Sequence, residues 1–456
     1  MRLTILGGGG FRVPLVYRAL LADHAEGRVS HVTLYDLDAS RLAAIGRVLA
    51  EQARGVADAP EVSVTTDLDS ALADVDFVFS AVRVRGLEGR VIDERVALDA
   101  GVLGQETVGA GGISYGLRTI PVMTRIARRI AELAPDAWVI NFTNPAGMVT
   151  EAMSAHLGDR VIGICDSPVG LGARVATALG VDPAAARLDY AGLNHLGWLR
   201  GLYVDGRDQL PRLFADDALL TSFEEGKLFG AELLRSLGTI PNEYLHYYYF
   251  NRETVAAARA AVKTRGAFLL DQQRGFYERL AVGSVAAAPA KPAVAALSEW
   301  DRTRLEREET YMAENRAAVA AGGRDSCDMQ SGGGYENVAL ALMRAIARDE
   351  RTTLILNVRN RGALRMLDRD AIVEVPCHVD ANGPRPLAAD PLPSHAAGLV
   401  FAAKAVERDV IEAAARGSRE LAVRALALHP LVDSVSVARR LFDAYREAIP
   451  ELGYLR

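Results

Sequence analysis

The stretch that decides the fold stands at the start of the chain: RLTILGGGGFRVPLVYRALLA, residues 2–22. Residues 2–6 form an apolar run typical of a buried strand, and residues 13–22 repeat apolar side chains at helical spacing. The glycines between them allow backbone N–H groups at the start of a helix to approach an anion closely. Strand, glycine loop and helix therefore predict the first unit of a dinucleotide-binding domain.

The second predicted strand, residues 31–35, ends at Asp36. A carboxylate in this place would accept a hydrogen bond from a ribose 2′-hydroxyl and would disfavour a 2′-phosphate. The expected cofactor contacts are Gly7, Gly8, Gly9, Gly10, Phe11, Arg12 and Asp36. The alternative is a plain glycine turn, but the succession of strand, glycines, helix, strand and terminal Asp favours a dinucleotide.

The alternation of strands and helices continues along the first third of the chain. Further strands are expected at residues 62–65, 75–80, 137–141 and 161–165, and helices at 40–57 and 119–133. Continuous apolar strands of this kind predict a parallel sheet that is covered on both faces. Residues 104–112, which are rich in glycine, are expected to form a loop.

Beyond residue 170 the pattern becomes mostly helical, with two strands expected at 352–357 and 372–379. We therefore predict an α/β protein whose N-terminal part is a Rossmann-like doubly wound parallel sheet. The expected division is a NAD-binding domain over residues 1–170 and a helix-rich α+β domain over residues 171–456, which would supply catalysis, substrate binding and oligomerisation.

The composition is that of an ordinary globular protein: 456 residues, 50% hydrophobic, 24% charged, net charge −6. No Lys/Arg-rich run and no apolar run of transmembrane length is present, so neither nucleic acid nor membrane is an expected partner. The cysteines are too few for a disulfide framework and fit a reducing compartment; they are Cys165, Cys327 and Cys377. We expect a cytoplasmic protein.

Polar side chains follow two of the predicted strands. Asn141 and Asn144 come at and after the end of strand 137–141, and Cys165-Asp166 ends strand 161–165. In a parallel sheet the carboxyl ends of the strands face one ligand crevice. The amides are suited to sugar hydroxyls or to a nicotinamide, although an Asx-type turn explains them equally well.

Cys165 and the later His195 are candidate metal ligands. A thiolate and an imidazole suit a soft-to-borderline divalent ion such as Mn, Fe, Co, Ni or Zn, and two protein ligands leave positions open for substrate oxygens. The alternative is a small buried cysteine and a core histidine. Because the two residues lie far apart and have no diagnostic spacing, the residues alone leave both interpretations open.

Two further segments carry residues suited to a site. Tyr244 begins a run with four tyrosines in six residues, YLHYYY, for which core packing is the alternative explanation. Several arginines flank the predicted loop 104–112: Arg83, Arg85, Arg90 and Arg95. They form either a solvated basic face or the binding surface of an anionic substrate.

Eight segments between residues 7 and 377 occur together and in a characteristic order. They are the GGGG loop with Pro14, RVIDE at 90–94, GQETVGAGG at 104–112, NFTNPAG at 141–147, ICDSP at 164–168, GLNHLGW at 192–198, IPNEYLHYYY at 240–249 and VEVPC at 373–377. In this combination the chain resembles glycoside hydrolase family 4, the NAD- and divalent-metal-dependent phosphoglycosidases. The resemblance covers most of the chain.

The resemblance implies a mechanism that differs from the two-carboxylate hydrolysis of most glycosidases. NAD+ oxidises the sugar at C3, a base removes the C2 proton, and elimination between C1 and C2 expels the aglycone. Water then adds at C1 and the hydride returns, so that the cofactor is catalytic. A divalent metal, for which the resemblance implies Mn²⁺, stabilises the negative charge of the enolate intermediate. The expected substrate is a phosphorylated disaccharide or glycoside, and the expected assembly is a homodimer or homotetramer.

The resemblance also implies roles for individual residues. Cys165 and His195 match the metal ligands, Tyr244 the catalytic base, and Asp166 a proton donor to the leaving group. Asn144 matches a contact to the sugar and is expected to touch the cofactor as well. The expected substrate contacts are Arg90, Asn144, Asn194 and Arg265, the last being the candidate for the 6-phosphate.

Two features depart from the family pattern or divide its members. Gly10 and Val13 stand where the family commonly has Ser and Thr, so Arg12 is expected to compensate for lost phosphate contacts. Asp166 after the metal cysteine is typical of phospho-α-glucosidases, whereas RGLEGR at 85–90 and NFTNPAG resemble the β type. We expect a 6-phospho-β-glucosidase, with a 6-phospho-α-glucosidase of the same family as the alternative.

Two other classes of protein share the nucleotide domain. A NAD-dependent hydroxyacid dehydrogenase would need no metal and leaves Cys165, His195 and Tyr244 unexplained. A non-catalytic NAD- or sugar-sensing protein has no support, because these three residues are all present.

Overall fold

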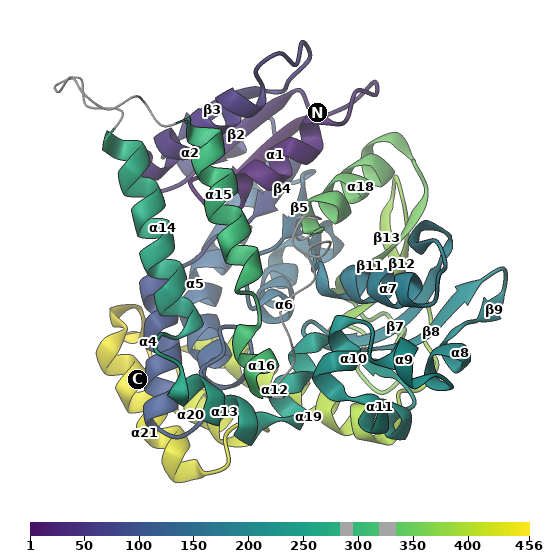
Figure 1. The fold of residues 1–456 in the computed structure, drawn as a ribbon. Coiled ribbons are helices and arrows are strands. Elements are labelled where there is room, and N and C mark those ends of the chain that lie inside the picture. The colour runs from purple at the N-terminus through teal and green to yellow at the C-terminus, as the bar shows by residue number, and fades with distance from the viewer. Residues whose placement is uncertain (283–294, 319–333) are drawn as a thin grey trace.

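The computed structural model describes residues 1–282, 295–318 and 334–456 and is built on one mixed sheet (Figure 1). Its first six strands run parallel in the order β3-β2-β1-β4-β5-β6, which is the Rossmann order. They are β1 (Arg2–Leu6), β2 (His31–Tyr35), β3 (Glu61–Thr65), β4 (Phe77–Ser80), β5 (Trp138–Asn141) and β6 (Val161–Gly163). The predicted fold class is confirmed.

Both faces of the parallel sheet are buried, as its apolar strands predict. Along β1, Leu3 and Ile5 belong to the core cluster on one face, while Leu6 belongs to the cluster on the other. In β4, Phe79 and Val78 divide in the same way. The first face is covered by α1 (Val13–Leu21), α2 (Ala39–Gln52) and α7 (Ser167–Ala178), the second by α5 (Gly109–Leu133) and α6 (Ala146–Leu157).

The sheet continues beyond β6 with antiparallel strands from the second half of the chain, in the order β11-β12-β7-β8-β10. β11 (Thr352–Arg359) and β12 (Ile372–Asp380) confirm two predicted strands; the others are β7 (Arg187–Leu193), β8 (Leu196–Val204) and β10 (Ile240–Pro241). The expectation of a mostly helical segment after residue 170 is therefore wrong for β7 and β8. They form a hairpin whose turn consists of Asn194 and His195. This pair is not among those, such as Asn-Gly, that mark a hairpin turn in a sequence.

The glycine-rich segment 104–112 is only partly a loop, because α5 already begins at Gly109. Glycines are expected to break a helix, but here they permit close backbone contact. A Cβ atom on Gly111 would lie 2.2 Å from the Gln105 carbonyl oxygen, and one on Gly112 would lie 2.5 Å from that of Thr107. The first turn of α5 is thus packed directly onto the preceding loop.

Helices from the second half of the chain pack onto the N-terminal unit. α14 (Arg265–Val282) and α15 (Ala296–Glu309) run side by side and contact α2 (Figure 1). α18 (Tyr335–Arg348) contacts α1. At the other end of the molecule, a second core joins α5 to three C-terminal helices, which are α19 (Ser394–Arg416), α20 (Arg419–Leu428) and α21 (Val435–Ala448).

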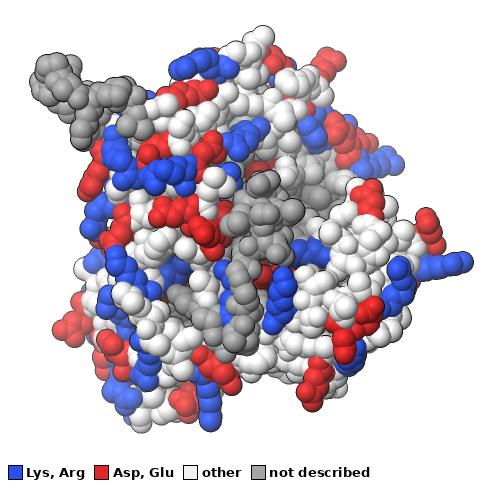
Figure 2. Space-filling model, in the orientation of Figure 1, with Lys and Arg blue, Asp and Glu red and all other residues white. Residues whose placement is uncertain are grey.

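Figure 2 shows acidic and basic side chains interspersed over the described part of the face seen in Figure 1. Across residues 1–282, 295–318 and 334–456, none of the helices combines the length and apolar character that crossing a lipid bilayer requires. Cys165 and Cys377 are buried free thiols, and Cys327 lies outside the described residues.

Candidate active site

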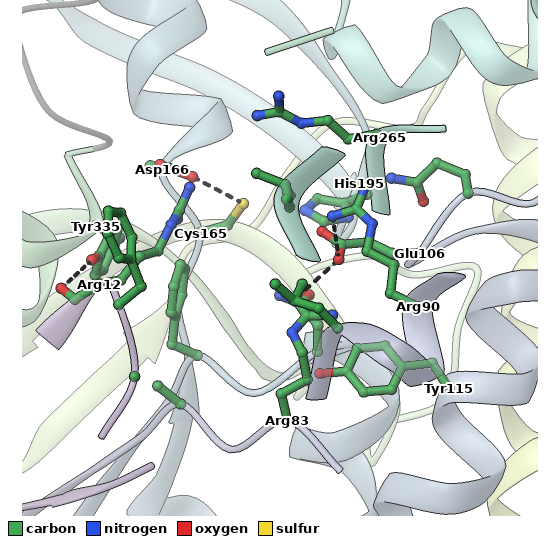
Figure 3. Close-up of a pocket in the computed structure, with 18 of the residues that line it drawn as sticks. Arg12, Arg83, Arg90, Glu106, Tyr115, Cys165, Asp166, His195, Arg265 and Tyr335 are labelled. Atoms are coloured by element: carbon green, nitrogen blue, oxygen red, sulfur yellow. Dashed lines mark hydrogen bonds and ion pairs between the residues drawn. The ribbon is translucent and has the colours of Figure 1, made fainter. Parts of the chain in front are cut away.

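A cavity of about 920 Å³ lies at the carboxyl end of the parallel strands. It brings together side chains that are as far apart in sequence as Arg12 and Tyr335 (Figure 3). The predicted site residues that line it are Gly7, Gly10, Phe11, Arg12, Asp36, Arg90, Asn144, Cys165, Asp166, Asn194, His195, Tyr244 and Arg265. Gly8 and Gly9 are buried and do not line the cavity. The predicted set therefore converges on one place.

The glycine loop makes a tight turn that requires small residues. Gly7 has φ +81°, and a Cβ atom on it would lie 2.6 Å from the Ala81 carbonyl oxygen. A Cβ atom on Gly8 would lie 2.7 Å from the Leu34 Cβ atom. The backbone N–H groups of both glycines donate to the Tyr35 carbonyl oxygen, at 2.9 and 2.8 Å. The loop is thereby fixed against β2 with its surface open to the cavity.

Three aromatic side chains from the second half of the chain hold the carbonyl groups of this loop. The Tyr277 hydroxyl donates to the Gly9 oxygen at 2.7 Å. The Trp300 indole N–H donates to the Phe11 oxygen at 2.8 Å, and the Tyr335 hydroxyl donates to the Arg12 oxygen at 3.0 Å. Because a trans peptide directs its N–H opposite to its C=O, these bonds orient the following N–H groups away from α14, α15 and α18.

Asp36 stands at the end of β2, as predicted, and lines the cavity. Its Oδ2 accepts the Gly9 N–H at 3.1 Å, and its Oδ1 accepts the Asp38 N–H at 3.1 Å. The carboxylate therefore helps to shape the glycine loop, in addition to facing the place expected for a ribose.

Arg12 is the N-cap residue of α1, and its guanidinium group lies beside a stacked pair of aromatic rings, Phe142 and Tyr335, whose centroids are 4.2 Å apart. The guanidinium carbon lies 5.2 Å from the centroid of Tyr335 and 5.7 Å from that of Phe142. In Figure 3 the side chain runs toward Asp166. Arg12 is therefore a positive group inside the cavity rather than on its rim.

Cys165 lies two residues after the end of β6, and Asp166 is the N-cap residue of α7. The thiol lies 3.9 Å from the Asp166 Oδ1 atom. Burial, and then the charges of Glu374 and Asp166, raise the pKa of the Cys165 thiol well above its ordinary value. Burial likewise raises the pKa of Asp166, against the opposing effect of Arg12. Both shifts disfavour the anionic forms, and a bound cation would favour them.

His195 occupies the β7–β8 turn with φ +61° and is buried beside the cavity. Burial lowers its pKa to about 3, so the imidazole is neutral at physiological pH. Its Nδ1 atom lies 2.8 Å from the Thr107 hydroxyl. A neutral imidazole with one nitrogen engaged by the protein has the other available as a metal ligand.

The donor set fits a divalent ion that the substrate helps to coordinate. Cys165 and His195 both line the cavity, and they are the thiol and imidazole that such an ion binds. Within the described residues, no three side chains of His, Cys, Asp or Glu come together as a ready-made metal cage. The protein therefore leaves coordination positions for other oxygens.

Tyr244 lies against His195. The two rings are stacked in parallel, with centroids 3.6 Å apart and an interplanar angle of 2°. The Tyr311 hydroxyl donates to the Tyr244 hydroxyl at 3.3 Å. Burial, followed by the neighbouring Tyr311 and Glu243, raises the pKa of Tyr244 well above its ordinary value. In the same aromatic run, Tyr249 instead accepts the Trp198 N–H at 3.3 Å and serves packing.

Several arginines line the cavity. Arg83 and Arg90 bind the Glu106 carboxylate at 3.0 and 2.7 Å, and these charges hold the pKa of Glu106 below its ordinary value despite its burial. Arg265, at the top of Figure 3, donates to the Arg307 carbonyl oxygen at 2.8 Å and to the Thr310 hydroxyl.

Arg307 also lines the cavity, and the sequence patterns did not single it out. Burial, and then the charges of Arg12 and Arg265, lower the pKa of Arg307 to about 9. Arg307 is therefore close enough to Arg12 and to Arg265 to be repelled by both, an arrangement that an anion would stabilise.

The two predicted amides have different surroundings. Asn141 is buried, and its amide donates to the Thr150 hydroxyl at 3.0 Å and to the Thr143 carbonyl oxygen at 3.2 Å, so it closes the turn. Asn144 lines the cavity and accepts the Ala146 N–H at 3.3 Å. Asn194 also lines the cavity and donates to Glu374 Oε1 at 3.2 Å.

Glu374 is a second residue that the sequence patterns missed. Burial raises its pKa to about 7, and it accepts hydrogen bonds from Asn194, Asn357 and Tyr190 at 3.2, 2.8 and 3.2 Å. A signal was present, because Glu374 is a lone carboxylate inside the apolar run that becomes β12. For Arg307 no comparable signal exists in its charged helix.

Two family models match the chain. The model of the "Family 4 glycosyl hydrolase" matches residues 2–181, and that of the "Family 4 glycosyl hydrolase C-terminal domain" matches residues 190–432. A curated relative is the "Probable 6-phospho-beta-glucosidase" of Bacillus subtilis (strain 168). It is 31% identical over 458 residues, which cover 98% of this chain and 96% of the relative.

Two solved structures are similar over nearly the whole chain. The 6-phospho-beta glucosidase from Thermotoga maritima, with manganese, NAD+ and glucose-6-phosphate, is 26% identical, with a TM-score of 0.81 and 100% coverage of both chains. A 6-phospho-alpha-glucosidase from gut microorganisms, in complex with NAD and Mn²⁺, is 27% identical, with a TM-score of 0.78 and coverage of 98% and 97%.

Proposed function

The chain belongs to the family 4 glycosyl hydrolases, and from this premise we propose that it hydrolyses 6-phospho-β-glucosides. It is a glycosidase of the 6-phosphoglucosidase type, with NAD and Mn²⁺ as its cofactors. The observation that carries the proposal is the shared cavity: the glycine loop, Cys165, His195 and Tyr244 all border one space.

We assign the dinucleotide to the glycine loop and Asp36. The residues proposed to contact it are Gly7, Gly8, Gly9, Gly10, Phe11, Arg12, Asp36 and Asn144. The tight turn at Gly7, the close approach of Gly8 to β2 and the start of α1 are the features that suit a pyrophosphate. Asp36 faces the place of the ribose.

We assign the divalent ion to Cys165 and His195. When bound, NAD+ supplies a transient oxidation at sugar C3 and the divalent ion draws electron density from the sugar oxygens. The neutral imidazole of His195 and the buried thiol of Cys165 fit such an ion by chemical type. Asn194 and Asn144 are proposed to orient sugar hydroxyls beside it.

Tyr244 is proposed as the base that takes the proton from sugar C2. Its ring is held by the stack on His195, so its hydroxyl has one fixed direction within the cavity. Asp166 is proposed to give a proton to the departing aglycone oxygen. Its carboxyl group lies in the same cavity beside Cys165.

Arg265 and Arg90 are proposed to bind the substrate anion. A sugar 6-phosphate would relieve the repulsion that Arg307 experiences from Arg265 and Arg12, and a guanidinium fork matches the geometry of a phosphate. Arg90 is packed against Gly266, the residue after Arg265, and is fixed by Glu94 and Glu106 at 2.8 and 2.7 Å. Arg265 and Arg90 together would set the orientation of the sugar.

The β preference rests on sequence segments that border the cavity. RGLEGR at 85–90 and NFTNPAG at 141–147 resemble the β type, and Arg85, Arg90 and Asn144 line the cavity. One observation favours the alternative, a 6-phospho-α-glucosidase: Asp166 stands directly after Cys165 and faces the cavity.

The test is hydrolysis of 4-nitrophenyl 6-phospho-α- and 6-phospho-β-glucosides in the presence of NAD+, Mn²⁺ and a thiol reductant. We expect cleavage of the β substrate, and loss of cleavage when NAD+ or Mn²⁺ is withheld. Preference for the α substrate would overturn the anomer and make Asp166 the next residue to vary. Cleavage of neither would contradict the 6-phosphoglucoside substrate, and galactosides and glucuronosides would be assayed next.

Metal and thiol are tested on the same assay. If Cys165 and His195 bind the ion, excess chelator or thiol oxidation should abolish hydrolysis, and Mn²⁺ with a reductant should restore it. Full activity of a protein that metal analysis shows to be metal-free would contradict the assignment.

A further inference from the structure

A chain of polar contacts links His195 to the loop that precedes α5. The Thr107 hydroxyl lies 2.8 Å from His195 Nδ1 and donates to the Gln105 side-chain oxygen at 2.9 Å. That same oxygen accepts the backbone N–H groups of Thr107 and Val108 at 2.6 and 3.0 Å. Thr107 and His195 are both buried, so water does not compete for these bonds.

The hydrogens in this chain of contacts can be assigned one by one. The Gln105 Oε1 atom faces two backbone N–H groups, which require an oxygen and not an NH₂ group as their partner, so the amide orientation is fixed. The Thr107 hydroxyl has one hydrogen, and the Gln105 oxygen takes it. With its hydrogen directed to the Gln105 oxygen, which has none of its own, the hydroxyl presents a lone pair toward His195, and this arrangement assigns the donor role to Nδ1.

We propose that Thr107, set by Gln105, is a positioning residue that holds His195 as the Nδ1–H tautomer and so reserves the Nε2 lone pair for the divalent ion. This inference rests on the proposed function, in which His195 is a metal ligand. A histidine in the other tautomer would offer the ion an N–H group and would not bind it.

The neighbouring residues hold Gln105, Thr107 and His195 in the positions that these hydrogen bonds require. Gly111 and Gly112 pack so closely on Gln105 and Thr107 that a Cβ atom on either would meet a carbonyl oxygen at 2.2 or 2.5 Å. On the other side, the parallel stack on Tyr244 fixes the plane of the His195 ring. The imidazole therefore has its rotation, as well as its tautomer, set before an ion arrives.

The test compares two substitutions at one position. Thr107→Val keeps the shape and removes the acceptor, whereas Thr107→Ser keeps the hydroxyl. Full-length NAD-loaded protein, stripped of metal, is titrated with Mn²⁺ while free Mn²⁺ is followed by electron paramagnetic resonance. We expect Thr107→Val to weaken Mn²⁺ binding about 10- to 100-fold, the usual effect of losing such a partner, and Thr107→Ser to stay close to wild type.

Two further arms separate the possible failures. If His195→Ala leaves Mn²⁺ affinity unchanged, the metal assignment in the proposed function is wrong. If His195→Ala weakens binding but Thr107→Val does not, the positioning role alone is overturned. Should Thr107→Val fail to fold, the wild-type protein labelled with ¹⁵N-histidine answers the question. A proton on His195 Nδ1 supports the inference, and a proton on Nε2 contradicts it.

Discussion

The glycine loop and the His195 turn border the same cavity, but they differ in how completely the protein fixes them. Hydrogen bonds from within the protein hold the glycine loop in shape, whereas the His195 turn keeps positions that a ligand would fill. In the glycine loop, carbonyl groups of Gly9, Phe11 and Arg12 each receive a hydrogen bond from a distant aromatic side chain, at 2.7 to 3.0 Å. The loop therefore has its shape before any ligand binds, which lowers the entropic cost of binding.

In the His195 turn, the protein makes contacts to one ring nitrogen and to the ring face of the imidazole, but it does not complete a metal site. Thr107 engages Nδ1 and Tyr244 covers the ring, yet among the described residues no three side chains of His, Cys, Asp or Glu come together as a complete metal cage. Under the proposed function, the dinucleotide would be held by a backbone that is shaped in advance, while the ion and the reacting sugar would complete their site together.

The largest expected effect is on turnover, from a substitution beside the His195 turn. Tyr244→Phe removes the hydroxyl proposed to take the C2 proton and keeps the stack on His195. Loss of a general base typically costs about 10²- to 10⁴-fold in rate, so kcat should fall by that factor while NAD binding stays unchanged. Steady-state kinetics on the preferred 6-phosphoglucoside and a NAD titration check both statements.

The matched control is Tyr249→Phe, which removes a hydroxyl from the same aromatic run outside the cavity. Tyr249 accepts a bond from Trp198 and should affect stability slightly and turnover little. Equal turnover for Tyr244→Phe and wild type would remove Tyr244 from the mechanism.

The fold of the N-terminal half was predictable because each of its signals is local. The apolar strand 2–6, the glycines and the helix behind Pro14 specify one unit, and repetition of that unit specifies the sheet. The β7–β8 hairpin was missed because its turn consists of Asn194 and His195, neither of which marks a turn as Asn-Gly would. Gly111 and Gly112 misled because their partners are backbone atoms, which sequence does not show.

The site was predictable only in part. Patterns alone brought Cys165 and His195 to attention as candidates, and the family resemblance joined them to Tyr244. Thr107 and Trp300 could not be found in this way, since their partners His195 and Phe11 lie 88 and 289 residues away in sequence. Contacts of this range follow from the closing of the whole fold and leave no local periodicity.

An intermediate effect, on stability and on NAD affinity, is expected from a substitution in the glycine loop. Gly7→Ala places a Cβ atom 2.6 Å from the Ala81 oxygen at φ +81°, so the loop must move or strain. We expect the free energy of unfolding to fall by about 1–3 kcal/mol and NAD affinity to fall about 10- to 100-fold. Thermal denaturation and a NAD titration measure the two effects.

Gly46→Ala provides the control for that substitution. Gly46 lies within α2, and the position that a Cβ atom would take there has no neighbouring atom within 4 Å. Alanine should therefore add up to about 1 kcal/mol of stability and leave NAD affinity unchanged. If Gly7→Ala behaves like Gly46→Ala, the glycine loop is not under the constraint that its geometry indicates.

The smallest effect should follow from removing one of the aromatic donors. Trp300→Phe keeps a ring against Phe11 but loses the 2.8 Å bond to its carbonyl oxygen. A buried hydrogen bond contributes about 1 kcal/mol, so NAD should bind about fivefold more weakly while kcat at saturating NAD+ is retained. Trp138→Phe, the same change in β5 and outside the cavity, should leave NAD affinity at the wild-type value. An unchanged Kd for Trp300→Phe would mean that the loop keeps its shape without the second half of the chain, and the contrast between the two regions would then lie in the backbone of residues 7–12 alone.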